Sequence, residues 1–255
     1  MQTEQQIQFL EWDSDFFGLR IARVTINQLT TEIMAAVSAA CREQQIDCLY
    51  FLVAPEDTAT IRQAEEQGFH LVDIRVTLER QIAAHPGVWK SEAPAVRLAN
   101  AADIPALRLI AAANHRDSRF YHDGGFSSER CDELYATWIE KSCNGYADAV
   151  LVVDCGEGAV GYLSCHLQDN CTGQIGLVGI SSSCQGQGLG RHLLNESLRW
   201  FMAAGTSRIQ VVTQGRNLGA QRLYQKTGFL TSSLQLWYHK WFRTDGKGID
   251  TGAPK

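Results

Sequence analysis

Two short patterns in the last third of the chain carry residue types suited to an anion site and a proton donor. The first is the glycine-rich run Gln185-Gly186-Gln187-Gly188-Leu189-Gly190-Arg191. It follows an apolar run, residues 175–180, and opens a stretch with helical apolar spacing, residues 189–204. Glycines at such a strand-to-helix turn let an anion approach the backbone, and the first free amides of the helix point at it along the helix dipole. The run therefore predicts a pyrophosphate cradle.

The second pattern is NLGAQRLYQKTGF, which follows a predicted strand at residues 208–213. Asn217 can cap a helix that runs to residue 227, and Gly228 suits the left-handed turn that ends it. Tyr224 is then expected on the helix face toward the cradle. A tyrosine (pKa about 10) is protonated at pH 7, and it can donate a hydrogen bond or a proton to a departing thiolate whose thiol has a pKa near 8.5.

Each pattern also has a simpler interpretation: the glycines end a strand, and Tyr224 is a half-buried helix aromatic. Two rival nucleotide sites fit worse. No Lys-Ser or Lys-Thr pair follows the glycines, so the phosphate-binding loop of nucleoside triphosphatases does not fit. No acidic residue closes the strand at 208–213, as a dinucleotide-binding fold would require.

Taken together, Q-x-x-G-x-G and N-x-x-A-x-x-x-Y-x-x-x-G-F, within residues 177–229, resemble the GNAT N-acetyltransferase superfamily. The resemblance implies a mixed α/β sheet in which two adjacent parallel strands splay apart around acetyl-CoA. It implies that Tyr224 is the general acid and that the backbone near Val178 stabilises the oxyanion. The implied cosubstrate-binding residues are Val178, Gly179, Ile180, Gln185, Gly186, Gln187, Gly188, Leu189, Gly190, Arg191 and Asn217.

Composition limits the class of protein. With 255 residues and 45% hydrophobic content, the chain can bury one large core or two modest ones. A formal charge of −5 argues against nucleic-acid binding. The N-terminal residues show neither a signal peptide nor a membrane span, which predicts a soluble cytoplasmic protein. Eight cysteines without a C-x-x-C pair predict free thiols.

No metal is predicted. The histidines form neither H-x-H nor H-E-x-x-H, and the cluster His115, Asp117, His122 and Asp123 lacks the register that would converge on one ion. A solvated loop accounts for that cluster better.

The stretch at residues 81–95, with two prolines and no period, predicts a linker between an N-terminal domain (1–88) and a GNAT domain (94–243). Asp103 is expected to cap the first helix of the second domain. Residues 244–255 lack any apolar period and predict a disordered tail.

Residues 48–69 align without a gap on residues 208–229, and both segments end in Gly-Phe. Because Ala64 occupies the tyrosine position and no glycine run precedes Cys48, we interpret the first domain as a partial, degenerate GNAT-like copy that shapes the acceptor site. The alternative is that any strand-helix-strand unit ending in Gly-Phe would align as well.

A narrower resemblance concerns the acceptor. The stretches D-S-x-F-F-G, Ser118-Arg119-Phe120, Trp138-Ile139-Glu140 and Val212-Thr213-Gln214 look like the acetyltransferases that modify dTDP-linked 4-amino-4,6-dideoxyhexoses in bacterial surface-polysaccharide synthesis. This resemblance implies acetylation of the sugar 4-amino group, in the galacto configuration, and a homodimer. The expected substrate-binding residues are Asp13, Asp15, Phe17, Arg119 and Gln214.

Three side chains are candidate bases for the acceptor amine, namely His166, Asp13 and Asp15. Arg119 could pair with the nucleotide diphosphate or form a plain surface salt bridge. Two other functions stay open: a GNAT enzyme acting on a peptide, polyamine or antibiotic amine, and a non-catalytic acetyl-CoA sensor.

Overall fold

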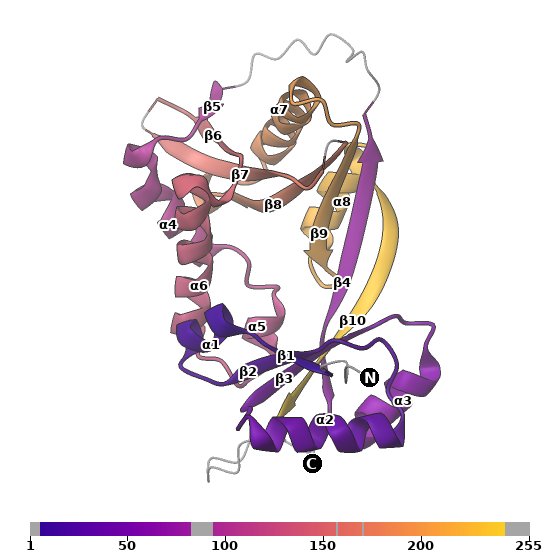
Figure 1. Cartoon of the computed structure of the whole chain (residues 1–255). Helices are drawn as coiled ribbons and strands as arrows, with labels where there is room; N and C mark the ends of the chain where they lie inside the picture. Colours follow the sequence, from indigo (N-terminus) through magenta and orange to yellow (C-terminus); the bar gives the residue numbers. More distant parts are fainter. Residues whose placement is uncertain (1–5, 83–93, 157, 170, 243–255) are drawn as a thin grey trace, which may run out of the picture. The chain divides into compact units, whose positions relative to one another are not determined.

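A computed structural model describes residues 6–82, 94–156, 158–169 and 171–242, and the chain divides into two compact units made of interleaved segments (Figure 1). Unit 1 comprises Met1–Ile74, Arg119–Ser127 and Leu234–Lys255. Unit 2 comprises Arg75–Ser118 and Ser128–Ser233. No helix among the described residues is both long and apolar enough to cross a membrane.

Unit 1 contains strands of a mixed sheet, and two helices pack against them in its core. Its strands follow the order β1-β2-β3-β10, in which only the β2–β3 pair is parallel. Met34, Val37 and Cys41 of α2 and Ala64 of α3 are buried in one cluster with the strand residues. The elements that belong wholly or partly to this unit are β1 (Ile7–Phe9), α1 (Glu11–Phe17), β2 (Ile21–Val24), α2 (Thr31–Glu43), β3 (Cys48–Val53), α3 (Thr58–Glu66), β4 (His70–Gln81), α5 (Arg119–His122) and β10 (Leu230–Trp241).

Unit 2 is a mixed sheet with strand order β4-β9-β8-β7-β6-β5, in which only the β8–β9 pair is parallel. Its further elements are β5 (Val96–Leu98), a 3₁₀ turn (Ala101–Asp103), α4 (Ile104–Ala113), α6 (Ser128–Lys141), a π-helical turn (Ser142–Tyr146), β6 (Ala149–Asp154), β7 (Ala159–Leu167), β8 (Thr172–Ile180), a 3₁₀ turn (Ser182–Cys184), α7 (Leu189–Ala203), β9 (Arg208–Gln214) and α8 (Leu218–Lys226).

Helices cover both faces of the unit 2 sheet. Successive strand side chains point to opposite faces, so β7 divides its side chains between two cores. Leu163 and Cys165 join the cluster that includes Leu193 of α7 and Tyr224 of α8. On the other face, Tyr162 contacts His115, which follows α4, and α4 packs against α6 and β7.

Strands β4 and β10 each begin in one unit and end in the other. They also continue the gap-free alignment of residues 48–69 on 208–229, because β4 covers residues 70–81 and β10 covers 230–241. The pairing repeats as well: β10 pairs antiparallel with β3 in unit 1, and β4 pairs antiparallel with β9 in unit 2. Leu236 lies opposite Val53, and Val76 lies opposite Thr213 at the corresponding register.

The two halves therefore share strand, helix, strand and register. That the first half is a degenerate copy stays a prediction. The compact units do not coincide with the predicted domains 1–88 and 94–243. Part of β4 belongs to unit 2, and part of β10 belongs to unit 1, together with Arg119–Ser127. Most of the expected linker, residues 83–93, and the predicted tail lie outside the described residues.

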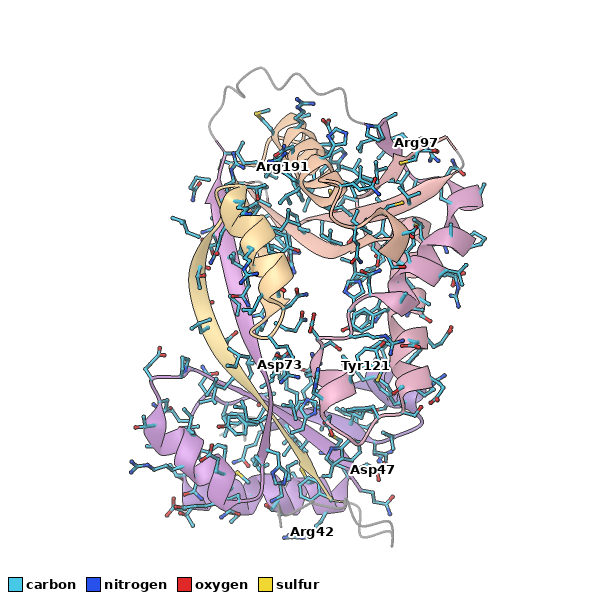
Figure 2. All side chains as sticks on the ribbon, turned by 180° about the vertical axis from the view of Figure 1, so that it is seen from behind. Arg42, Asp47, Asp73, Arg97, Tyr121 and Arg191 are labelled. Atoms are coloured by element: carbon cyan, nitrogen blue, oxygen red, sulfur yellow. The ribbon has the colours of Figure 1, made fainter. Side chains whose placement is uncertain are left out.

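One local expectation holds only in position, and another is wrong. Asp103 is the N-cap residue of α4, but its side chain makes no capping hydrogen bond to that helix; it closes the preceding turn with Asn100, and its carboxylate pairs at 2.7 Å with Arg97, which Figure 2 labels. The segment after Ser118 is not a solvated loop, because it forms α5 and its Phe120 is buried. Arg97 lies six residues before Asp103, whereas Phe120 packs against the ring of Phe17, about a hundred residues away in the sequence.

Candidate active site

The parallel pairing of β8 and β9 stops halfway along both strands. Ladder pairs run from Thr172 opposite Arg208 to Ile175 opposite Val211 and end there. Beyond this point, residues 176–180 have no partner on the β9 side among the described strands, and they include Val178, Gly179 and Ile180. Gln214, a predicted substrate residue, ends the diverging part of β9. The splay that the sequence predicted is present.

The glycine-rich run follows β8 and forms the turn into α7. Gly186 and Gly188 have φ values of +77° and +82°, which are left-handed conformations that favour glycine. Gly188 is the N-cap of α7, and no side chain caps that helix end. The first amides of a 15-residue helix are thus left for a ligand. Gln185 and Gln187 donate their side-chain amides to the carbonyls of Ile180 and Ser183 and hold the turn against β8.

Helix α8 starts as predicted. The Asn217 side chain accepts a hydrogen bond from the backbone N–H of Ala220 at 2.9 Å, and Gly228 ends the helix at φ +85°. Asp57 caps α3 in the same way through Thr60, at the aligned position of unit 1.

Tyr224 lies on the buried face of α8, with 5% of its surface exposed. Its ring packs 5.9 Å from that of Phe229. Burial raises the pKa of Tyr224 well above its ordinary value, so the phenol is neutral across the working range of pH. A neutral, desolvated phenol is a hydrogen-bond donor, and this is the property that a departing thiolate needs.

Two polar groups of β7 lie against the diverging part of β8. A β-bulge brings Ser164 Oγ within 2.8 Å of the backbone N–H of Leu177, which donates to it, and His166 Nε2 lies 3.3 Å from the same hydroxyl. A Cβ on Gly176 would sit 2.6 Å from both side chains, so only glycine leaves room for them. Burial lowers the pKa of His166, which keeps the imidazole neutral at pH 7 and able to accept a proton.

A second polar pair, which the sequence did not indicate, lies on the α4 side of the sheet. His115 Nε2 is 3.0 Å from the Tyr162 hydroxyl, and the His115 ring stacks on Tyr135 with 4.5 Å between centroids. Burial lowers the pKa of His115 to about 4. A Cβ on Gly179 would lie 2.9 Å from that hydroxyl, so the pair adjoins the splayed strand.

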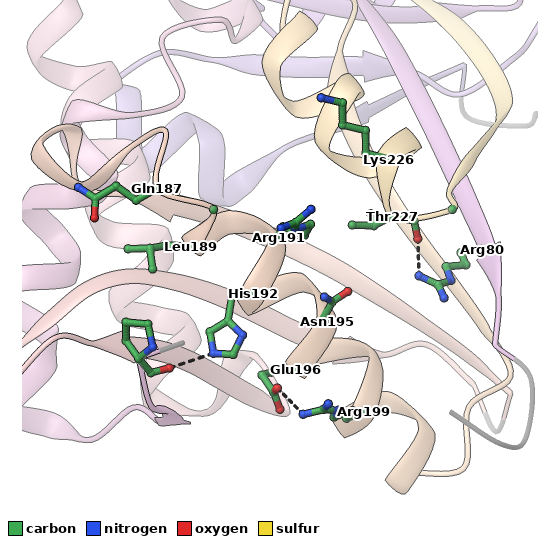
Figure 3. Close-up of a pocket in the computed structure, with 13 residues that line it drawn as sticks. Arg80, Gln187, Leu189, Arg191, His192, Asn195, Glu196, Arg199, Lys226 and Thr227 are labelled. Carbon is green, nitrogen blue, oxygen red and sulfur yellow. Dashed lines mark hydrogen bonds and ion pairs between the residues drawn. The ribbon is translucent and has the colours of Figure 1, made fainter. Parts of the chain in front are cut away.

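A pocket of about 640 Å³ opens beside the glycine turn (Figure 3). It includes four predicted residues, namely Gln187, Gly188, Leu189 and Arg191. The sequence analysis did not predict the remaining charged and polar residues that line the pocket, namely Arg80, His192, Asn195, Glu196, Arg199, Lys226 and Thr227. Residues 191, 195 and 199 repeat at helical spacing and could have been found. Arg80 gave no such signal, since it comes from β4.

In unit 1, the predicted acceptor residues fall into different environments. Phe17 of α1 packs against Phe126 with 4.5 Å between ring centroids, so it belongs to an aromatic core. Asp15 is exposed, whereas Asp13 is half-buried and burial raises its pKa, opposed by the charge of Arg119. Gly18 ends α1 at φ +65°, a left-handed conformation that favours glycine.

Arg119 lies among aromatic rings of unit 1. Its guanidinium carbon is 4.3 Å from the ring centroid of Trp237 and 5.2 Å from that of Tyr50. No salt bridge among the described residues involves Arg119, so the plain surface ion pair is wrong. Within the same part of the chain, Arg119 Nε and the Tyr50 hydroxyl are buried without a hydrogen-bond partner.

Asp123, expected in a solvated loop, is buried in unit 1. Its carboxylate accepts hydrogen bonds from the Trp241 indole N–H and from His239 Nδ1. Potential ligand atoms of Asp123, His239 and Cys48 lie within 4.8 Å of one another. Since Trp241 and His239 already occupy both carboxylate oxygens, the group holds α5 and β10 together. All eight cysteines are free thiols, as predicted.

Comparisons with known proteins agree with this geometry. The family model described as "Acetyltransferase (GNAT) family" matches residues 103–229. The chain is similar to the dTDP-fucosamine acetyltransferase of Escherichia coli, with 29% identity over 94% of this chain and 100% of the relative. It is also similar to the spore coat polysaccharide biosynthesis protein SpsD of Bacillus subtilis, with 24% identity over 71% of this chain and 70% of the relative. A solved GCN5-related N-acetyltransferase from Sphaerobacter thermophilus matches with a TM-score of 0.67 at 15% identity, over 93% of this chain and 76% of that one, which is a likeness of fold.

Proposed function

We propose that the protein, whose residues 103–229 form an acetyltransferase domain of the GNAT family, moves the acetyl group of acetyl-CoA onto the amino group of a nucleotide-linked amino sugar. Two features carry the proposal. The pairing of β8 with β9 ends at Ile175, and the glycine turn that follows β8 leads into α7, whose N-terminus has no side-chain cap. Unpaired strand edges suit the amide-rich pantetheine arm, and free helix amides suit the pyrophosphate.

The reaction we propose is a direct transfer. The neutral amine attacks the thioester carbonyl, a C–N bond forms, and the C–S bond breaks as the thiolate leaves. The backbone of Val178 to Ile180 stabilises the oxyanion, and Tyr224 donates to the departing sulfur. Because burial raises the pKa of Tyr224, full proton transfer to a thiolate is uphill. Tyr224 therefore acts mainly as a hydrogen-bond donor, and the proton lost by the amine restores the thiol.

The amine must be neutral to attack. A sugar amine flanked by hydroxyls is less basic than lysine, whose pKa is about 10.4, so modest help suffices. His166 is the base that the geometry favours, since it is neutral, half-buried and next to the splayed strand at Gly176. Asp15 is a weaker candidate, because its side chain is exposed to solvent.

The acceptor proposal rests on the full-length likeness to dTDP-fucosamine acetyltransferase. We assign the acceptor as a dTDP-4-amino-4,6-dideoxyhexose of galacto configuration, acetylated at its 4-amino group. In unit 1, Arg119 would bind the diphosphate, since none of the carboxylates that the structure describes pairs with it and its planar fork matches phosphate oxygens. Asp13 would bind the sugar hydroxyls. Gln214, the last residue of β9, would also contact the acceptor.

A thiol-release assay with acetyl-CoA and a panel of amines tests this proposal. The panel contains dTDP-4-amino-4,6-dideoxygalactose, its gluco epimer, the matching UDP sugars, spermidine and a lysine peptide. We expect turnover with the dTDP-amino sugars and strongest turnover with the galacto form. Turnover with only the peptide or spermidine would show that the acceptor class is wrong, and binding of acetyl-CoA without turnover of any amine would favour a sensor.

A further inference from the structure

Three cations without carboxylate partners line the pocket beside the glycine turn. Arg80 comes from β4, Arg191 from the first turn of α7 (Figure 2), and Lys226 from the last turn of α8. No salt bridge among the described residues involves any of the three. By contrast, Arg199 in the same pocket pairs with Glu196. Within the described residues, the pocket thus concentrates positive charge that no carboxylate pairs with.

Arg80 is held in place by the end of α8. Its guanidinium donates a hydrogen bond to the carbonyl oxygen of Thr227, the C-cap residue of that helix, as Figure 3 shows. Its Cζ lies 3.6 Å from where a Cβ of Gly228 would be, so it packs closely over the helix end. Burial lowers the pKa of Arg80, which fits a cation that is partly desolvated. One of its five N–H donors is used, and the others can meet an anion.

The pocket is larger than a pyrophosphate requires. Its α7 residues run from Leu189 to Arg199, about 15 Å along the helix axis at 1.5 Å per residue. The free amides of α7 lie at the glycine end, whereas Lys226 and Arg80 lie at the end of α8. A ligand with one anionic group at the turn and a second, separate one further on matches this layout. The nucleotide end of coenzyme A is such a ligand, because its ribose carries a 3′-phosphate in addition to the pyrophosphate.

We propose that Arg80 and Lys226 bind the 3′-phosphate of acetyl-CoA and make the enzyme discriminate against 3′-dephosphorylated coenzyme A, whereas Arg191, in the first turn of α7, lies with the free helix amides that meet the pyrophosphate. A phosphate monoester carries close to two negative charges at pH 7, and Arg binds phosphate oxygens through two parallel N–H donors. Arg80 belongs to the strand that the N-terminal half contributes to unit 2, so that half supplies part of the cosubstrate site. This inference rests on the proposed use of acetyl-CoA and goes beyond the glycine turn that the family pattern marks.

The strand position equivalent to Arg80 in the second half of the chain also carries a cation, but in a different environment. Position 240 aligns with position 80, and Lys240 lies over the rings of Phe69 and Phe242, 5.7 Å and 5.1 Å from their centroids. Unit 1 thus has a cation at the equivalent strand position, but it is engaged with aromatic rings and no glycine run lies in that half.

Isothermal titration calorimetry on the full chain tests the inference, with coenzyme A, 3′-dephospho-coenzyme A and adenosine 3′,5′-bisphosphate as ligands. Wild type is expected to bind coenzyme A at least about tenfold more tightly than the dephospho form, the equivalent of one charge-assisted hydrogen bond. Arg80→Gln and Lys226→Gln are expected to weaken binding of coenzyme A and leave binding of the dephospho form nearly unchanged, so the ratio approaches one.

Arg222→Gln is the matched control, because Arg222 is an exposed cation of α8 that does not line the pocket. Its ratio is expected to equal that of wild type, and the melting temperatures of all three variants show whether each is folded. Equal affinity of wild type for both forms of coenzyme A would overturn the inference and leave the proposed function intact. A ratio that survives in both pocket variants would overturn the residue assignment. Absence of binding to either form by the folded wild type would overturn the proposed function as well.

Discussion

Replacing Tyr224 with phenylalanine tests the chemistry most directly. The substitution removes one hydroxyl and keeps the ring, which packs near Phe229 in the core of unit 2. Since Tyr224 is only 5% exposed, no bulk water is expected to replace the lost donor. The fold should therefore survive while the departing thiolate loses its hydrogen bond.

The magnitude follows from that burial. A hydrogen bond to a charged group contributes about 1.5–3 kcal/mol, and loss of a preorganised donor in a water-excluded site costs about 10²–10³-fold in rate. We therefore expect kcat to fall about 100-fold, with little change in the KM for acetyl-CoA. The free energy of unfolding should change by less than about 1 kcal/mol, because no cavity is made.

Thiol release, measured with saturating acetyl-CoA and the amino-sugar acceptor, gives kcat, and calorimetry gives the affinity for coenzyme A. A Tyr224→Phe enzyme within about threefold of wild type, with unchanged affinity, would refute the donor role. The pH profile supplies a second check. Because burial raises the pKa of Tyr224, the wild-type rate should show no loss from phenol ionisation between about pH 8 and 10, the range below the ordinary tyrosine pKa. A tyrosine-dependent fall in that range would contradict this account.

Three further predictions concern the turn, the caps and pH. Gly188→Ala should weaken binding of acetyl-CoA about tenfold, because a residue with a Cβ at φ +82° costs about 1–2 kcal/mol and shifts the free amides of α7. The control is Gly205→Ala, at φ +84° after α7, which should lower stability by a similar amount without affecting binding. Equal losses of affinity in the two variants would argue against the cradle. Asn217→Ala should lower the free energy of unfolding by about 1 kcal/mol in urea titrations, and Asp57→Ala should lower it as well; an effect at one site alone would show that the caps are not equivalent. Burial lowers the pKa of His239 to about 4, whereas an unfolded histidine titrates near 6.5, so between these values the unfolded chain binds more protons. The contribution of neutral His239 to stability is therefore present above pH 6.5 and is lost as the pH falls toward 4. A urea midpoint that falls as steeply with pH in His239→Gln as in wild type would contradict this prediction.

Local sequence patterns predicted the secondary structure around the cosubstrate site. The strand, glycine turn and α7, the Asn217 cap and the left-handed Gly228 are all where residue spacing predicted them. Each depends on residues only a few positions apart, because caps, turns and helical periodicity are short-range properties of the backbone. The alignment of residues 48–69 on 208–229 likewise foretold two equivalent strand-helix-strand units.

Tertiary structure decided which distant segments meet. The exchange of β4 and β10 brings Arg80 to the pocket beside Arg191 and buries Asp123 against His239 and Trp241. No local pattern encodes a strand's partner, since antiparallel pairing depends on complementary faces and edges from anywhere in the chain. Asp103 shows that side-chain partners also escape spacing at short range: it occupies the N-cap position of α4, yet its carboxylate pairs with Arg97, six residues earlier, and not with the amides of that helix.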